Sequence, residues 1–573
     1  MEIPLEIPIN ITDEGREWAL QMLDGMSLDQ QIGQLIHVAA WSNKGADHEH
    51  EIIRQINEHH LGGLIFFQGN PKHQAELVNL YQSKSKVPLM ISIDGEWGLG
   101  MRLEGCESFP YQMTLGAIQD LELIEEMGKV IARQMKRVGV TLNHAPVIDV
   151  NTNPENPVIN FRSFGQDKKA VAQRAEAYMR GLQEEYVLAC AKHFPGHGDT
   201  AVDSHVELPL LDKSKAELKE TELYPFKELF EKGIGSVMVA HLQLPQLEPD
   251  PQRASTLSKA IVTDLLKKEM GFKGLVITDA LDMRAVADHY APGKVDVEAL
   301  LAGNDILLFV KDVRQAMVEI KQVIVDGKIS EKEIAQRCLK QLMYKHWMGL
   351  SKFLPLSTRH MEEDVNKETA LVNDRLYGAS LTLIHGEANL KAPNTIQKTH
   401  VISLFADGDR AEKGALSHHT LLKGKGNESQ SLPLFEKLLS EHLGENFKNE
   451  KLRFDDIQQQ KQSILNKLDS EQEVVLAIHD VKLKAPDNFG ITQHIIDFIS
   501  ELLQSKKVHL VFFGNPYALA NMSNLQHAHS ILMAYQENTY TYKYAAEALL
   551  GRYKPIGKLP VDINEIWPAG HGL

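Results

Sequence analysis

The sequence predicts an α/β protein with two domains, a (β/α)8 TIM-type barrel over residues 1–350 and a smaller α/β domain over residues 373–573. Three observations lead to the barrel. Short β-rich apolar runs alternate with longer amphipathic segments, which is typical of parallel βαβ units. There are eight such runs over about the length that a barrel needs. Polar residues of unusual type stand where several of the runs end.

The eight predicted strands are residues 34–40, 62–67, 88–94, 140–150, 187–194, 234–241, 273–280 and 304–310. Helical segments lie between most of them, with clear examples at 120–139 and 168–186. Ser27 and Gln30 form a capping box and so mark the start of a helix before the first strand.

The strand ends favour a barrel over an open doubly wound sheet. Asp94, Lys192, His193, His241 and Asp279 all close a predicted strand. In a barrel the carboxyl ends of all strands meet on one face, where the active site lies. In an open sheet only the ends beside the switch point would meet.

The second domain follows a linker predicted over residues 351–372. Its predicted strands are residues 380–384, 399–405, 473–479, 508–514 and 529–535. Helical segments between these five strands predict a smaller layered α/β domain.

Composition excludes several classes of protein. The formal net charge of −16 argues against a nucleic-acid partner and against binding to anionic membrane surfaces. The three cysteines are too few and too far apart for a disulfide framework. No apolar stretch is long enough to span a membrane, and the first residues lack the features of a signal peptide. A cytoplasmic location is therefore expected, or a periplasmic or exported one if a leader has been removed.

The stretch "AKHFPGHGDTAVDSH" (191–205) concentrates reactive side chains. His193, His197, Asp199, Asp203 and His205 could be metal ligands, but the HxH of a metal-dependent barrel hydrolase and HExxH are both missing. The glycines lack the pattern of a phosphate-binding loop. Asp203 and His205 lie two residues apart, so in an extended segment the carboxylate can orient the imidazole for acid/base work.

Asp279 is the second candidate for chemistry. It closes an otherwise apolar strand in "FKGLVITDALDM", which is an unusual place for a structural aspartate. Asp282 is better explained as a charge at a helix N-terminus. No GxSxG motif is present, so the sequence does not indicate the commonest kind of serine hydrolase.

These segments carry a family resemblance. "KHFPGHGDTAVDSH" and "FKGLVITDALDM" strongly resemble glycoside hydrolase family 3, and within it the β-N-acetylglucosaminidase branch. The segments at 61–67, 93–102, 142–151 and 160–165 agree in the same order, and the C-terminal half is similar to the α/β sandwich domain of that family. The resemblance covers most of the chain and is most specific over residues 60–283.

The resemblance implies a retaining mechanism with a covalent glycosyl-enzyme. It places the nucleophile at Asp279 and the acid/base at His205, assisted by Asp203. It also implies a set of residues that bind the terminal sugar, namely Asp94, Arg102, Arg162, Lys192 and His193. No metal and no organic cofactor is expected. The family segment "DQEGG" reads "DGEWG" here, so Trp97 is either an aromatic platform for a sugar or a core residue.

The expected function is that of an exo-β-N-acetylglucosaminidase that removes terminal β-linked GlcNAc from muropeptides or chitin-like oligosaccharides. A β-N-acetylglucosaminide phosphorylase and a β-glucosidase of the same family are the nearest alternatives. A metal-dependent barrel hydrolase and a carbohydrate-binding protein without activity are the more distant ones.

Overall fold

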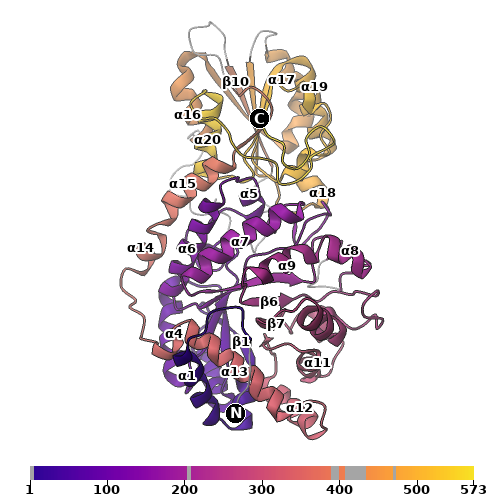
Figure 1. Ribbon diagram of the computed structural model, residues 1–573. Helices are drawn as coiled ribbons and strands as arrows, with labels where there is room; N and C mark the ends of the chain where they lie inside the picture. The colour runs from indigo at the N-terminus through magenta and orange to yellow at the C-terminus, as the bar shows by residue number, and fades with distance from the viewer. Residues whose placement is uncertain (1–5, 203–207, 389–398, 407–433, 469–472) are drawn as a thin grey trace. The chain divides into compact units, whose positions relative to one another are not determined.

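The computed structural model of the protein describes residues 6–202, 208–388, 399–406, 434–468 and 473–573 (Figure 1). The chain divides into two compact units. The barrel unit comprises residues 1–109, 124–163 and 168–370, and the second unit comprises residues 110–123, 164–167 and 371–573.

The barrel unit is built on eight parallel strands that lie side by side in the order β7-β6-β5-β4-β3-β2-β1-β8. The main chains of Ile277 and Ile306 join β7 to β8, so the sheet is a nearly closed barrel and not an open one. All eight predicted strands are confirmed. Their bounds are β1 Ile36–Trp41, β2 Gly63–Phe67, β3 Met90–Ile93, β4 Leu142–Asn143, β5 Leu188–Phe194, β6 Ser236–Val239, β7 Leu275–Thr278 and β8 Leu307–Leu308.

Helices surround the strands of the barrel unit, as Figure 1 shows for α4, α6, α7, α9 and α11. In chain order they are α1 Asp13–Asp24, α2 Leu28–Gln34, α3 Ala46–His59, α4 Pro71–Lys84, α6 Leu121–Arg137, α7 Lys168–Glu184, α8 Lys215–Glu220, α9 Leu223–Glu231, the π-helix η4 Ala260–Glu269, α10 Arg284–Ala287, α11 Lys294–Ala302, α12 Val313–Val325, α13 Glu331–Trp347 and α14 Met361–Asn366. Short 3₁₀ turns are η1 Leu99–Met101, η2 Asn160–Arg162, η3 Ser255–Leu257 and η5 Leu350–Lys352. None of the helices in the described part of the chain is both long enough and apolar enough to cross a bilayer.

The capping box predicted from the sequence begins α2. The Ser27 hydroxyl accepts from the Gln30 backbone N–H, and the Gln30 side chain accepts from the Ser27 N–H at 2.9 Å. Two donors that a helix start leaves without partners are thereby satisfied. A further helix, α1, precedes it and packs along α13.

Helix α13 closes the N-terminal end of the barrel. Its Lys345 donates to Gln34, at the end of α2 and just before β1, at 2.6 Å. Tyr344 donates to the carbonyl of Gly235, just before β6, at 2.8 Å. Asp305, just before β8, lies 3.0 Å from both Lys340 and Lys267 and is 2% exposed. Because every one of these partners precedes a strand, α13 lies at the end opposite to the strand carboxyl ends.

The second unit contains a six-stranded sheet in the order β11-β10-β12-β13-β14-β9, in which β9 alone is antiparallel to its neighbour. The strands are β9 Thr382–Gly386, β10 Thr399–Phe405, β11 Phe447–Arg453, β12 Glu473–His479, β13 Lys507–Phe512 and β14 Ser530–Met533. Its helices are α5 Gln112–Gly116, α15 Thr369–Ser380, α16 Leu434–Leu443, α17 Ile457–Lys467, α18 Pro486–Phe489, α19 Gln493–Ser505 and α20 Thr539–Leu549. Figure 1 shows α16 and α20 on one side of this sheet and α17 and α19 on the other.

The units differ from the predicted domains in two respects. The predicted linker 351–372 lies largely in the barrel unit, where the Asn79 side chain bonds the main chain of Leu356 at 2.9 and 2.7 Å. Residues 110–123 and 164–167 join the second unit, where the Ala117 carbonyl accepts from Lys558 N–H and the Gln166 side chain accepts from Asp562 N–H. These tertiary contacts join segments far apart in the chain, so no local pattern signals them.

Candidate active site

Lys192 stands at the centre of a buried ion network at the carboxyl end of the barrel. It comes from β5 and is only 2% exposed. Its Nζ lies 3.1 Å from Asp94 Oδ1 and 2.9 Å from Glu96 Oε1. Both carboxylates follow β3, so one ammonium group links the ends of two strands.

Two arginines complete the network from short 3₁₀ turns. Arg102 follows η1, and its Nη2 lies 2.7 Å from Asp94 Oδ2. Arg162 ends η2 and forms a bidentate pair with Glu96, at 2.9 Å from Nε and 2.7 Å from Nη2. A bidentate guanidinium–carboxylate pair fixes orientation as well as charge.

The charges of this network hold each other in the ionised state. Burial alone would raise the pKa of Asp94, but Lys192 and Arg102 lower it well below its usual range. Burial acts in the same direction on Glu96, yet Arg162 and Lys192 lower the pKa of Glu96 to about 2. The same two carboxylates outweigh the burial of Lys192 and raise its pKa.

His193 is oriented by Asp149. Its Nδ1 lies 2.7 Å from Asp149 Oδ2, and the backbone N–H groups of His193 and His197 also donate to this carboxylate. A carboxylate can only accept here, so Nδ1 carries a proton. Nε2 then points toward Arg162, 3.4 Å away, and toward the network.

Asp279 follows β7 and is partly exposed. Its Oδ1 accepts from the Ala280 N–H at 2.8 Å. Burial would raise its pKa, but the nearby His241 and His193, the Ala280 N–H and Lys192 lower it. His241, from the end of β6, is held by the Thr256 hydroxyl at 2.7 Å and by the Ala280 carbonyl at 3.0 Å. Asp279 is therefore an ionised carboxylate with access to solvent.

The structure brings together all five residues that the family resemblance assigns to sugar binding, and two of them, His193 and Lys192, lie near enough to Asp279 to lower its pKa. Their roles remain predictions. Asp203 and His205 lie outside the described residues. In the preceding loop, His197 Nδ1 bonds the Thr200 hydroxyl at 2.7 Å. In the described part of the chain, no group of three or more His, Cys, Asp and Glu side chains is arranged to hold a metal ion.

Sequence reasoning missed Glu96, Asp149 and His144. Both carboxylates lie in segments that resemble the family. Glu96 lies in the segment 93–102, and Asp149 lies in the segment 142–151, near the end of the fourth predicted strand. His144 is fully buried, neither of its ring nitrogens has a hydrogen-bond partner among the described residues, and burial lowers its pKa to about 4. Asp94 and Asp279 are both close enough to influence it.

Comparison with known proteins gives consistent matches. The model of the glycosyl hydrolase family 3 N-terminal domain matches residues 27–342. Beta-hexosaminidase A of Pseudoalteromonas piscicida is 30% identical over 386 residues, which are 62% of this chain and 62% of that protein. A beta-N-acetylglucosaminidase/beta-glucosidase of Cellulomonas fimi is 27% identical over 353 residues, 60% of this chain and 62% of that protein. The structure of a family 3 beta-N-acetylglucosaminidase from Paenibacillus sp. is 28% identical, with a TM-score of 0.71, and covers 94% of this chain and 99% of that one.

The ion network predicts unequal costs for two substitutions of similar size. Glu96→Met leaves Arg162 with no carboxylate partner among the described residues and should lower the free energy of unfolding by about 3–5 kcal/mol. Lys192→Met should cost less, because Asp94 keeps Arg102 and Glu96 keeps Arg162. Urea unfolding of the full chain measures both.

Lys321→Met is the matched control, since Lys321 pairs with Asp29 at an exposed site. It should change stability by less than about 1 kcal/mol. Equal losses for Glu96→Met and Lys192→Met would contradict the pairing described above.

Proposed function

Because the chain belongs to glycosyl hydrolase family 3, we propose that it is a retaining exo-β-N-acetylglucosaminidase that hydrolyses terminal β-linked GlcNAc. The matched curated relatives include one named beta-hexosaminidase and one named beta-N-acetylglucosaminidase/beta-glucosidase. Each match spans 62% of the length of the relative. The names of these relatives therefore support the proposed activity but do not establish it for this chain.

The observation that carries the proposal is the state of Asp279. A nucleophilic carboxylate must be ionised, reachable and aimed at the anomeric carbon. Asp279 is partly exposed at a strand end, its pKa is lowered, and one of its oxygens is fixed by the Ala280 N–H. The fixed oxygen orients the carboxylate and leaves the other oxygen for attack.

In the proposed first step, Asp279 attacks the anomeric carbon while the bond from that carbon to the leaving oxygen breaks. His205, assisted by Asp203, donates a proton to the leaving oxygen. In the second step, water attacks the same carbon, the bond to Asp279 breaks, and His205 takes the proton from the water. The two displacements retain the configuration of the sugar.

The ion network is proposed to hold the non-reacting hydroxyls of the sugar. Asp94 offers carboxylate lone pairs, and Lys192, Arg162 and Arg102 offer charged donors. His193 offers its Nε2, because Nδ1 is bound to Asp149. Vicinal hydroxyls are both donors and acceptors, so an alternation of carboxylate and cationic groups matches them. Chitin-like oligosaccharides and muropeptides are the proposed substrates.

A panel of aryl β-glycosides tests the reaction. We expect release of the aryl group from the GlcNAc glycoside at a kcat/KM well above those for glucose and xylose, and loss of at least about 10⁴-fold in Asp279→Ala, since the covalent step is then impossible. A 2-fluoro sugar should add to Asp279 by intact mass and peptide mapping. The sugar product is then identified in reactions with and without phosphate. Hydrolysis yields free GlcNAc, whereas phosphorolysis yields a GlcNAc phosphate.

No turnover of any aryl glycoside and no adduct on Asp279 would refute the proposed activity. A preference for the glucoside would support the β-glucosidase alternative. Activity that a strong chelator abolishes would support a metal-dependent hydrolase.

The pH profile tests the electrostatic role of His241. His241 lowers the pKa of Asp279, so the nucleophile stays ionised as the pH falls until that lowered pKa is reached. His241→Gln should raise the pKa of Asp279 and move the acid limb of the kcat/KM profile to higher pH, while activity near neutral pH changes less. His289→Gln, at an exposed position, is the control. An acid limb that stays in place in His241→Gln would show that His241 does not act on Asp279 through charge.

A further inference from the structure

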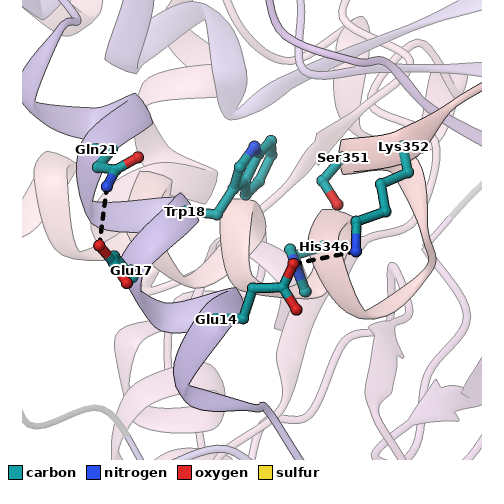
Figure 2. Close-up of a pocket in the computed structure, with 7 residues that line it drawn as sticks. All are labelled: Glu14, Glu17, Trp18, Gln21, His346, Ser351 and Lys352. Carbon is teal, nitrogen blue, oxygen red and sulfur yellow. Dashed lines mark hydrogen bonds and ion pairs between the residues drawn. The ribbon is translucent and has the colours of Figure 1, made fainter.

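A second candidate site lies on the barrel unit, far from the strand carboxyl ends. The Trp18 pocket is a hollow of about 260 Å³ between α1, the end of α13 and η5. Figure 2 shows the indole of Trp18 between two polar pairs. The pocket is lined by Glu14, Glu17, Trp18, Gln21, His346, Ser351 and Lys352.

The place of this pocket separates it from the catalytic centre. Helix α13 bonds residues that precede β1, β6 and β8, so it lies at the N-terminal end of the barrel. The network around Lys192 and Asp279 lies at the other end, where active sites of such barrels are built. A ligand in the Trp18 pocket is therefore bound without being turned over.

The pocket combines an aromatic surface with hydrogen-bonding groups. Trp18 is partly exposed, and its ring lies 5.8 Å from that of His346 with an angle of 48° between the planes. Glu14 pairs with Lys352 at 3.0 Å on one side, and Glu17 accepts from the Gln21 amide at 3.1 Å on the other. An indole face suits the C–H groups of a sugar ring, and the carboxylates and the ammonium suit its hydroxyls.

The charge and the volume of the Trp18 pocket limit the kinds of ligand that it can bind. Glu14, Glu17 and Lys352 leave the lining with an excess of one negative charge, which disfavours phosphorylated and other anionic ligands. Lys352 already neutralises Glu14, so a cation would have to displace an existing partner. The volume is below the roughly 300–1,000 Å³ of pockets for drug-sized ligands, so a single ring fits better than a longer ligand.

We propose that the Trp18 pocket is a non-catalytic binding site for one pyranose residue of a neutral oligosaccharide. The saccharide class rests on the proposed function, but binding here does not require turnover. A longer substrate held at this end of the barrel stays near the protein between catalytic events.

The test counts binding sites for the GlcNAc trimer by isothermal titration calorimetry. The full chain carries Asp279→Asn to prevent turnover. We expect two sites in this parent, and one site after Trp18→Ala, with affinity at the lost site reduced at least about tenfold. Trp18→Phe, which keeps an aromatic ring, should retain part of the binding. Trp347→Ala is the matched control, because Trp347 lies on α13 beside His346 but contacts Tyr186 and does not line the pocket.

The outcomes separate this inference from the proposed function. One site in the parent that disappears in Trp18→Ala would support the Trp18 pocket even if the catalytic site did not take GlcNAc. Unchanged binding in folded Trp18→Ala and Trp18→Phe variants would overturn the inference. Tighter binding of the deacetylated, cationic glucosamine trimer at this site would overturn it in favour of a cation site. Hydrolysis of an aryl β-GlcNAc substrate should be the same in Trp18→Ala as in the wild-type chain.

Discussion

The active-site end of the barrel depends on the burial of one positive charge. The ammonium group of Lys192 is almost fully removed from water, and such a charge is tolerated only when carboxylates surround it. Asp94 and Glu96 supply this pairing, and each then requires an arginine of its own. The short turns η1 and η2 bring these arginines to the carboxylates.

This network also determines the electrostatics at Asp279. Two carboxylates, Asp94 and Glu96, are surrounded by three cations, so the network has an excess of positive charge. Lys192 contributes directly to the lowered pKa of Asp279, together with His241 and His193. The network proposed to hold the sugar therefore also helps to keep Asp279, the proposed nucleophile, ionised. In the proposed mechanism, sugar binding and the ionisation of Asp279 depend on the same charges, so a substitution in the network is expected to affect both.

Much of this arrangement could be predicted from the sequence, because its signals are local. The eight apolar runs of the barrel are visible along the chain, and the polar residues at their ends favour a closed barrel, which the pairing of Ile277 with Ile306 confirms. Strand β11 was missed, since "FKNEKLR" has no apolar run and only Leu452 is buried at this edge of the sheet. Glu96 and Asp149 were missed as site residues because they bind other side chains of the site, namely Arg162, Lys192 and His193. These partners are 44 to 96 residues away in the chain, so no local sequence pattern signals the pairing.

The two ends of the barrel show why spacing alone cannot identify such residues. At the N-terminal end, Asp305 lies between Lys340 and Lys267 and also accepts from the Val276 N–H. At the carboxyl end, Lys192 lies between Asp94 and Glu96. Both clusters are buried ion networks that join strands to neighbouring elements. They differ in what borders them: the Asp305 cluster is covered by α13, whereas the Lys192 cluster adjoins the partly exposed Asp279 and the Nε2 of His193. The two networks therefore differ in access to solvent at a strand carboxyl end and not in the presence of buried charge, which is why the Lys192 network is the one proposed as a site for chemistry.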